Sequence, residues 1–371
     1  MEMNLIVPCL FGVEALIAAE LRDFGAKDVF AENGRVLFSG DETLLARVNI
    51  NSRYSERVQI LVGSFETHTF NDLFEATKAL PWEIWLEKTD SFPVKGYSIN
   101  SDLFSVSDCQ SIIKKAVVER LKIIYKIDWF EETGPIHQIQ FSILNNNVCV
   151  LLDTTGYGLH KRGYRLDSNT APIKETLAAA LCNISKLRPY HTLYDPMCGS
   201  GTILIEGAMM AKNIAPGLHR NFSAERWRVV PENIWKNERD RAKSLERTTD
   251  SFFAFGSDID EVSISNAKMN AERACVKDLI EFTIADLKDF EPKSERGTII
   301  CNPPYGERML DTAQSEQLYG LMGRMFKQKK GWSYTIINPS ETFEASFGRI
   351  ADKRRKLYNG MIKCQAYMYY K

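Results

Sequence analysis

The 371-residue sequence lacks any apolar run of the roughly 20 residues that a helix needs to cross a lipid bilayer. It also lacks, at its start, a basic segment followed by an apolar core, which is the pattern of a secretory signal. We therefore expect a cytoplasmic protein with no membrane partner. At this length, two or three domains are expected.

Patterns of metal ligands are missing as well. The five histidines form no His-Glu-x-x-His motif, and the eight cysteines are scattered with no Cys-x-x-Cys pair. We expect no metal site, and we expect reduced thiols, as in the cytoplasm. The net charge is only −1, so composition gives no overall signal for a nucleic-acid partner, although such a chain can still carry a local basic face.

The most informative stretch that is present lies between residues 192 and 210, where a short apolar strand, a glycine turn and an apolar helix follow one another. Gly199 and Gly201 let the backbone approach a ligand closely, because neither carries a Cβ atom. The start of the helix adds unpaired N–H groups. Asp195 brings a carboxylate to the end of the strand. A phosphate would not need that carboxylate, whereas a ligand with an ammonium group would use it.

A second motif, Asn302-Pro303-Pro304-Tyr305, follows another apolar strand. The two prolines fix φ and remove two N–H donors, so the turn presents acceptors. The side-chain carbonyl of Asn302 and the backbone carbonyl of Pro303 can hold the two hydrogens of an exocyclic amine. Tyr305 offers a flat face to a base, which must be unpaired or flipped to reach it. The alternative is a rigid strand-to-helix connection without chemistry.

From residue 192 onward, strands and helices alternate, which predicts a mostly parallel sheet covered on both faces. Residues 356–370 instead predict an antiparallel hairpin around Asn359-Gly360. Ligands of such sheets bind at the carboxyl ends of the strands. Four side chains are predicted to lie at such ends: Asp195, Asp258, Asp286 and Asn302.

With both motifs identified, the sequence resembles class I S-adenosylmethionine methyltransferases that act on exocyclic amines. More narrowly, it resembles the bacterial THUMP-domain RNA guanine-N2 methyltransferases that modify 23S rRNA. The narrower resemblance rests on Asp-Pro-Met-Cys-Gly-Ser-Gly-Thr at 195–202 and Asn-Pro-Pro-Tyr-Gly-Glu-Arg at 302–308, with further matches at 160–165, 171–175 and 215–220. It covers essentially the whole chain.

That resemblance implies S-adenosyl-L-methionine as cofactor and methylation of a guanosine N2 amine in RNA, with 23S rRNA favoured over tRNA. A nicotinamide cofactor is disfavoured, because Leu204 stands where the dinucleotide fingerprint requires its third glycine. Methylation of an adenine or cytosine amine in DNA is an alternative that the Asn-Pro-Pro-Tyr motif shares. A non-catalytic RNA-binding assembly factor is another, against which Asp195, Asn302 and Tyr305 argue.

Roles for individual residues follow from the resemblance. Asp195 and the glycine loop suit the methionine end of the cofactor, Asp258 the two ribose hydroxyls, and Asp286 the adenine amine, although each acid alone could instead cap a helix. The expected cofactor-binding set is Asp195, Cys198, Gly199, Gly201, Thr202, Asp258, Ile259, Asp286 and Asn302. The expected catalytic set is Asn302, Pro303 and Tyr305.

The expected fold class is α/β, with a Rossmann-like methyltransferase sheet at residues 160–371 that ends in the antiparallel hairpin. Before it, residues 1–50 predict an α+β, ferredoxin-like leader, with a hairpin at Asn33-Gly34. Residues 51–155 fit a THUMP domain, which binds RNA in the family. Residues 213–251 exceed what a simple β–α–β unit needs, and read as a lid over the substrate or as a solvated excursion; we favour the lid.

Two basic groups are predicted to contact RNA. Lys114, Lys115 and Lys122 lie on the polar face of an expected helix, although a solvated helix would show the same pattern. Lys161, Arg162 and Arg165 surround Tyr164 at the junction with the methyltransferase part. Clustered cations with an aromatic ring suit a phosphate backbone and one stacked base, and a solvated linker is the alternative.

Overall fold

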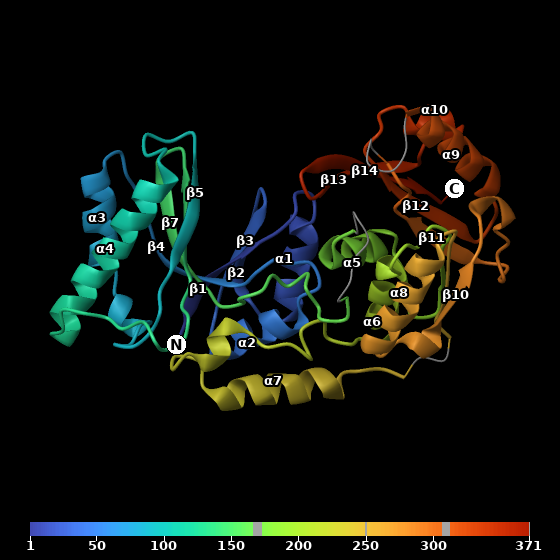
Figure 1. Ribbon diagram of the computed structural model, residues 1–371. Coiled ribbons are helices and arrows are strands. Elements are labelled where there is room, and N and C mark those ends of the chain that lie inside the picture. Colours follow the sequence, from blue (N-terminus) through green and yellow to red (C-terminus); the bar gives the residue numbers. More distant parts are fainter. Residues whose placement is uncertain (166–172, 249–250, 306–311, 371) are drawn as a thin grey trace.

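The computed structural model describes residues 1–165, 173–248, 251–305 and 312–370. These residues form two seven-stranded sheets that lie at the two ends of an elongated molecule (Figure 1). Within those ranges, no helix is long and apolar enough to cross a membrane. The described residues are α/β throughout, and the two sheets correspond to the two regions expected before and after residue 160.

The first sheet has the strand order β2-β3-β1-β4-β7-β6-β5. Its strands are β1 (Met3–Pro8), β2 (Lys27–Glu32), β3 (Arg35–Gly40), β4 (Gln59–Glu66), β5 (Val94–Ile99), β6 (Ile139–Leu144) and β7 (Asn147–Asp153). Its helices are α1 (Glu14–Asp23), α2 (Glu42–Asn51), α3 (Phe70–Ala79) and α4 (Val106–Tyr125), with the 3-10 turn η1 (Trp82–Ile84). The hairpin predicted at Asn33-Gly34 joins β2 to β3, with Gly34 at φ +77°.

One strand connects the leader to the THUMP part. β4 pairs with β1 through Leu5 and Ile60, and with β7 along most of its length, both antiparallel. The two parts that the sequence suggests as separate units therefore share a continuous sheet. Backbone hydrogen bonding across this strand fixes their relative orientation.

The second sheet has the order β10-β9-β8-β11-β12-β14-β13. Its strands are β8 (Thr192–Asp195), β9 (Phe253–Asp258), β10 (Ile280–Ile284), β11 (Gly297–Cys301), β12 (Trp332–Asn338), β13 (Lys353–Asn359) and β14 (Ile362–Tyr369). The first five are parallel to one another. β14 runs antiparallel to both β12 and β13, so the chain ends in the predicted antiparallel hairpin. The helices are α5 (Glu175–Ile184), α6 (Thr202–Lys212), α8 (Glu261–Arg273), α9 (Thr312–Met325) and α10 (Phe343–Phe347), with 3-10 turns η3 (Lys277–Leu279) and η4 (Leu287–Asp289).

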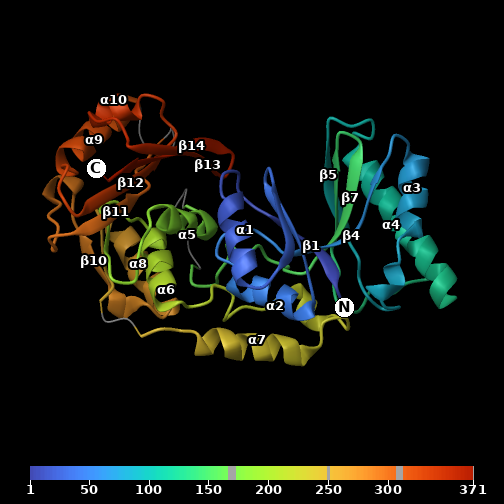
Figure 2. The same cartoon turned by 180° about the vertical axis from the view of Figure 1, so that it is seen from behind.

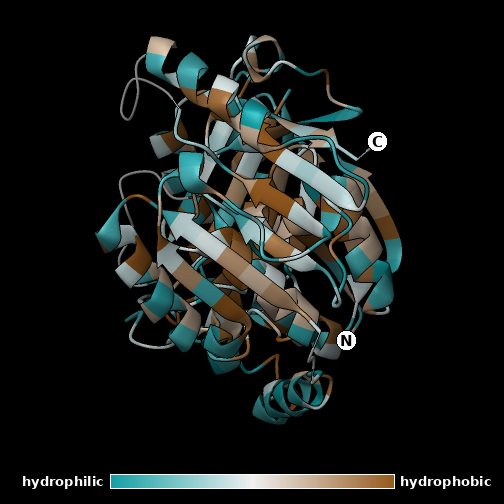
Figure 3. Ribbon diagram, turned by 90° about the vertical axis from the view of Figure 1, so that its right-hand side faces the viewer, coloured by the Kyte–Doolittle hydropathy of each residue, from teal (hydrophilic) through white to brown (hydrophobic). Residues whose placement is uncertain are grey.

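Neighbouring residues on a strand point to opposite faces, and both faces of this sheet are covered. Leu193 packs in the core with α5, α6 and α8, whereas the adjacent Tyr194 packs in a separate aromatic core with α9 and α10. Every residue of the central strand β11 is buried as a result. In Figure 3 the outer helices alternate between hydrophilic and hydrophobic residues, because each buries one face only.

Residues 213–248, which we call the strap, do not form the lid that the sequence favoured. They contain η2 (Ser223–Arg226) and α7 (Glu232–Ser244), which runs along the leader beside α2 (Figure 2). Arg47 of α2 donates to both carboxylate oxygens of Glu238, at 2.9 and 2.8 Å. Trp227 stacks on His137 of the THUMP part, with centroids 4.2 Å apart. The strap thus ties the methyltransferase part to both preceding parts.

Candidate cofactor and amine site at the carboxyl ends of the strands

The two glycines of the loop between β8 and α6 have different roles. Both have positive φ, +51° at Gly199 and +78° at Gly201, where other residues are strained. A Cβ atom on Gly201 would lie 3.0 Å from the ring of Phe282 and 3.1 Å from Ala267, so this glycine allows close packing. A Cβ atom on Gly199 would meet nothing within 4 Å. Gly199 therefore borders open space, where a ligand can approach the backbone.

Asp195, the last residue of β8, is only 2% exposed. Its carboxylate accepts a hydrogen bond from Met197 N–H at 3.2 Å, and it has no cationic partner among the described residues. Burial, followed by the nearby Asp258, raises the pKa of Asp195 well above its usual 3.8. A buried carboxyl without a counter-ion is costly to ionise, and a ligand ammonium would supply that counter-ion. This residue fits the methionine end of the predicted cofactor.

Asp258, at the end of β9, holds the glycine loop. Its carboxylate accepts from Gly199 N–H at 2.8 Å and from Asp260 N–H at 3.1 Å. A carboxylate has about four lone-pair directions, so acceptor capacity remains for ligand hydroxyls. The next residue, Ile259, leaves 72% of its surface exposed beside this carboxylate, which provides an apolar platform at the same strand end.

Three other residues of the expected cofactor set have internal partners. Asp286 caps η4 by accepting Lys288 N–H at 3.0 Å, and this bond lowers the pKa of Asp286. Cys198 is buried and donates its backbone N–H to Ser257 at 2.9 Å. Thr202 is buried at the first turn of α6, and its hydroxyl accepts from Arg165 at 3.2 Å. Cys198 and Thr202 therefore help to shape the loop. Asp286 caps η4, and its contact with the adenine amine stays a prediction.

The second motif begins where β11 ends, next to β8. Thr298 and Ile299 of β11 pair with Leu193 and Tyr194, which brings the turn beyond Cys301 close to Asp195. The charge of Asp195 contributes, after burial, to raising the pKa of the Cys301 thiol.

In this motif the side-chain oxygen Oδ1 of Asn302 is buried and has no hydrogen-bond partner in the described chain. Buried acceptors in proteins are normally paired, so this unpaired oxygen is a candidate acceptor for a donor on a ligand. Pro303 is buried beside it. The Tyr305 hydroxyl accepts from Nδ2 of Asn359, in the terminal hairpin, at 2.7 Å.

Matches to known proteins agree with this geometry. Residues 162–368 match the family described as RMKL-like, methyltransferase domain. The chain belongs to this family. Residues 4–59 match the RlmL ferredoxin-like domain, and residues 67–153 match the THUMP domain.

Individual relatives align over nearly the whole chain. The protein named "Putative RNA methyltransferase YpsC" from Bacillus subtilis is 43% identical over 100% of this chain and 96% of its own length. "Ribosomal RNA large subunit methyltransferase K/L" from Shewanella baltica is 32% identical over 99% of this chain but 53% of its own length. The chain thus spans about half the length of the K/L proteins.

Solved structures have the same fold. "Crystal structure of SMU.472, a putative methyltransferase complexed with SAH" superposes with a TM-score of 0.94 at 40% identity, covering 100% of this chain and 98% of that one. A structure described as a predicted N6-adenine-specific DNA methylase from Listeria monocytogenes gives 0.93 at 42% identity, with 100% and 96% covered. Like its family, this chain is a methyltransferase that uses S-adenosyl-L-methionine.

Within this family fold, two of the cations expected to contact RNA serve internal roles. Arg162 is 5% exposed and donates to the carbonyls of Leu159, at 2.8 Å, and Arg53. Arg165 pairs with Glu175 at 3.0 Å and also contacts Thr202. The Arg162 guanidinium is enclosed between the leader and the methyltransferase part, so its assignment to RNA is wrong. Arg165 is partly exposed, and its assignment to RNA stays a prediction.

Tyr164, expected to stack on a base, is also buried, and its hydroxyl donates to Glu206 of α6 at 3.1 Å. Lys161, by contrast, is exposed. Glu175 and Glu206 lie in the next helix and the one after it, α5 and α6, and the spacing of residues gave no signal of their pairing with this segment.

The lysines of α4 differ from one another. Lys114 turns inward, pairing with Glu132 and lying 3.6 Å from the centroid of the Phe92 ring. Lys122 lies 3.3 Å from Glu119 on the helix surface. Lys115 is exposed, and its Nζ lies 5.7 Å from the centroid of the Phe74 ring. Lys114 stabilises its own domain, so of the three, Lys115 is the best placed to meet a phosphate.

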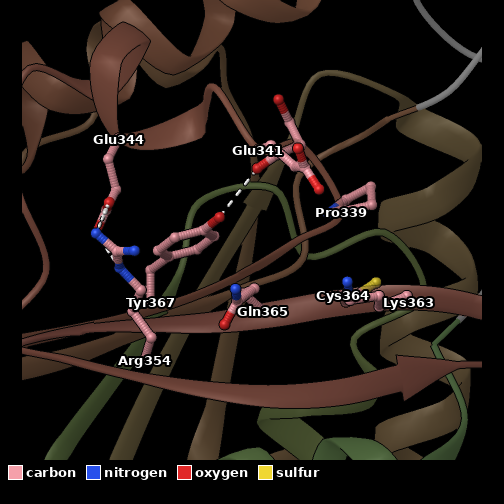
Figure 4. A pocket seen from close by; sticks show the side chains of 9 residues that line it. Pro339, Glu341, Glu344, Arg354, Lys363, Cys364, Gln365 and Tyr367 are labelled. Atoms are coloured by element: carbon pink, nitrogen blue, oxygen red, sulfur yellow. Dashed lines mark hydrogen bonds and ion pairs between the residues drawn. The ribbon is translucent and has the colours of Figure 1, made fainter.

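A pocket near the second motif was not predicted. It encloses about 260 Å³ above β14 and beneath α10 (Figure 4). Cys364 contributes to its wall, and the thiol of Cys364 lies 4.0 Å from the Tyr305 hydroxyl. The lining offers hydrogen-bond donors and acceptors suited to a polar ligand: Pro339, Ser340, Glu341, Glu344, Arg354, Lys363, Cys364, Gln365 and Tyr367. The residues that line this pocket lie far from the second motif along the sequence, and for this reason the sequence did not predict the pocket.

Some predicted residues lie outside the described ranges, namely 171–172 and 306–308 of the motifs that carry the resemblance. In the described part of the chain, no group of three or more His, Cys, Asp or Glu side chains could hold a metal ion.

Proposed function

We propose that this chain transfers a methyl group to the exocyclic N2 amine of a guanosine in RNA, and that large-subunit rRNA is its substrate. The observation that carries the proposal is the unpaired, buried Oδ1 of Asn302 beside Pro303, at the strand next to Asp195. Two carbonyl acceptors at one turn match the two hydrogens of an amine.

The cofactor, when bound, supplies an electrophilic methyl group on a sulfonium. Asp195 would hold its ammonium, and Asp258, which fixes Gly199, would hold the ribose hydroxyls. These contacts would orient the methyl donor toward the second motif. Correct placement of two reactants accounts for a large part of the barrier reduction in such transfers.

At the second motif, Asn302 and Pro303 hold the amine hydrogens and turn the nitrogen lone pair out of conjugation with the base. Positive charge develops on that nitrogen during transfer, and the two carbonyl dipoles stabilise it. The product loses its extra proton readily to water, so no strong base is needed. Burial raises the pKa of the Cys198 and Cys301 thiols well above their usual range, which makes either a poor nucleophile for a covalent route.

The choice of RNA is supported by the THUMP match at residues 67–153 and by the names of the relatives, which call them RNA or ribosomal RNA methyltransferases. The N2 position of guanosine is supported by the resemblance of the two motifs to that class. The same chemistry on tRNA, or on adenine or cytosine in DNA, uses the same motif, so the product must be identified directly.

The deciding experiment is mass spectrometry of nucleosides from rRNA and tRNA of cells that lack this protein. We expect N2-methylguanosine to fall in large-subunit rRNA and to return with the wild-type gene but not with Asn302→Ala. A deficit of N2-methylguanosine confined to tRNA would show that tRNA, and not large-subunit rRNA, is the substrate. A deficit of N6-methyladenine in DNA would overturn the proposal. Unchanged nucleosides together with normal S-adenosyl-L-homocysteine binding would favour a non-catalytic role.

A further inference from the structure

Two cationic side chains, a histidine and a tyrosine form a surface where the three parts of the chain meet. We call it the junction patch: Tyr157, Lys161, His219 and Arg220. Tyr157 and Lys161 lie in the segment between β7 and α5, whereas His219 and Arg220 belong to the strap. Tyr157 is 77% exposed, Lys161 and His219 are exposed, and Arg220 is partly exposed. An aromatic ring so exposed on a rigid segment has no role in the core.

Arg220 fixes the shape of this patch. Its guanidinium donates to the carbonyls of Gly158 at 2.8 Å and Lys161 at 2.9 Å, and also to that of Tyr157. These bonds hold the backbone on which Tyr157 and Lys161 are carried. Ordering a surface aromatic before a ligand arrives lowers the entropic cost of binding to it.

Lys161 and Arg220 give the patch two positive charges, and neither forms an ion pair with an acid of the described residues, although Asp153 exerts some attraction on Arg220. Among the described residues, Arg220 donates only to carbonyls, and Lys161 has the Tyr157 ring, at 5.5 Å, as its neighbour. The nearby acids are committed elsewhere, since Asp153 pairs with Arg57 and Glu56 pairs with Lys174.

The electrostatics of Arg220 agree with this picture. Burial, followed by the like charges of Arg162 and Arg57, lowers the pKa of Arg220 to about 10. Three guanidinium groups crowded in this way are relieved by an anion. A phosphate suits an arginine especially well, because the planar guanidinium can donate two parallel hydrogen bonds to it.

We infer that the junction patch binds single-stranded RNA, with a base stacked on Tyr157 and the phosphate backbone on Lys161 and Arg220. The inference rests on the proposed function and names a surface that holds the RNA substrate outside the amine site. A stacked base beside cations is the usual arrangement for single strands, and it tolerates any base because every base has a flat face.

The patch is connected to the cofactor loop through a short, well-packed segment. Four residues after Lys161, Arg165 donates to the hydroxyl of Thr202 at the start of α6, directly after the glycine loop. Arg162, between them, is buried. The junction patch is therefore joined to the glycine loop by ordered residues.

The test uses the full chain and a fluorescent single-stranded oligouridine of about ten nucleotides, within the usual site size for single-strand binders. Tyr157→Ala should bind it about tenfold more weakly, the value of one lost stacking contact, whereas Tyr157→Phe should bind as the wild type does. Tyr190→Ala is the matched control, because Tyr190 is 67% exposed but lies at the opposite, amino end of β8.

A second pair of variants tests the phosphate contact. Lys161→Ala should weaken binding and reduce the slope of log affinity against log salt by about 0.7, the contribution of one single-strand phosphate. Lys268→Ala, at an exposed lysine of α8, should change neither. Equal thermal midpoints and equal S-adenosyl-L-homocysteine affinities across the variants show that folding and the cofactor site are intact.

The outcomes separate this inference from the proposed function. If the wild type binds the oligonucleotide while Tyr157→Ala and Lys161→Ala bind equally well with the same salt slope, the junction patch is not an RNA surface. Methylation of rRNA by the wild type would then still uphold the proposed function. If the wild type binds neither the oligonucleotide nor rRNA, both ideas fail together.

Discussion

The side-chain carboxylate of Asp258 accepts the backbone N–H of Gly199 at 2.8 Å, and so joins the end of β9 to the loop that follows β8. Gly199 is the loop residue that borders open space. One acid therefore sets the shape of the loop and stands ready to accept hydrogen bonds from a ligand. Cofactor capture and loop geometry are coupled through this single contact.

This coupling predicts the behaviour of an Asp258 variant. Asp258→Ala should weaken S-adenosyl-L-homocysteine binding at least tenfold in calorimetric titrations, because charge-assisted hydrogen bonds worth roughly 1.5–3 kcal/mol are lost. The matched control is Asp260→Asn, which changes a neighbouring acid that caps α8 by accepting Ser263 N–H at 3.0 Å. If Asp258→Ala bound S-adenosyl-L-homocysteine as tightly as the wild type does, Asp258 would not be a cofactor-binding residue.

The buried carboxyl of Asp195 predicts a pH dependence. Its pKa is raised from 3.8 by burial, so the ligand-free folded chain keeps a proton that the unfolded chain has lost. The contribution of the Asp195 carboxyl to the free energy of unfolding is therefore fully present below about pH 4. It declines as the pH rises toward the pKa of Asp195 in the folded chain. An ammonium ligand favours the ionised form, so affinity for S-adenosyl-L-homocysteine should increase over the same interval.

Calorimetry in buffers of different ionisation enthalpy measures this effect directly. Ligand binding should release protons in the wild type, and Asp195→Asn should bind weakly with little proton release. A wild-type affinity that is flat from about pH 4 to neutrality would contradict the assignment of the ammonium to Asp195.

Local patterns made much of this molecule predictable. The alternation of strands and helices after residue 192 gave the parallel sheet, and the Asn33-Gly34 turn gave its hairpin, because both depend on residues close in sequence. Asp195, Gly199 and Asp258 were placed at strand ends by the same logic. Contacts across long separations carried no such signal. Arg162 looked like a surface cation because its acceptor in α6, Glu206, lies 44 residues away.

The prediction that the strap forms a lid was wrong for a related reason. Its length and charge suggested a lid, but Trp235 is buried and stacks on Phe222 within the strap, while Trp227 stacks on His137. These partners come from parts of the chain whose arrangement depends on the shared first sheet. Pairing of β4 with both β1 and β7 creates the surface on which the strap lies, and no local pattern encodes it.

The internal role of Arg162 predicts a stability difference between adjacent residues. Arg162→Ala should lower the thermal midpoint clearly, because removing one partner of a buried ion pair costs about 3–5 kcal/mol and leaves Glu206 uncompensated. Lys161→Ala, one residue earlier and exposed, should leave the midpoint nearly unchanged. Differential scanning calorimetry compares the two, and equal midpoints would show that Arg162 is not a buried partner in solution.

Tyr305 should tolerate loss of its hydroxyl better than loss of its ring. Tyr305→Phe keeps the ring and leaves Asn359 without its 2.7 Å contact, so we expect near-normal methyl transfer and a slightly lower thermal midpoint. Tyr305→Ala should raise the KM for RNA. Asn359→Ala is the control, since it removes the same hydrogen bond and keeps the ring. A loss of transfer in Tyr305→Phe as large as in Tyr305→Ala would mean that the hydroxyl, not stacking, is what matters.

Asn302 carries the proposed chemistry, and its variant separates binding from catalysis. Asn302→Ala removes the buried Oδ1 that has no partner among the described residues, but it leaves Asp195 and Asp258 in place. An interaction made mainly in the transition state lowers turnover with little effect on ground-state binding. One oriented dipole is typically worth about 10²–10³ in rate, and loss of control over the amine should add to that.

Single-turnover transfer of labelled methyl to rRNA, followed by nucleoside digestion, measures this loss. Calorimetry on the same protein should show nearly unchanged S-adenosyl-L-homocysteine affinity, because Asn302 acts on the amine and not on the cofactor. The Tyr190→Ala protein, altered at an exposed residue beyond the amino end of β8, serves as the control for handling and folding. Near-normal turnover of Asn302→Ala, or a labelled product that is N6-methyladenosine, would refute the proposal, since either result breaks the link between this carbonyl pair and the guanosine amine.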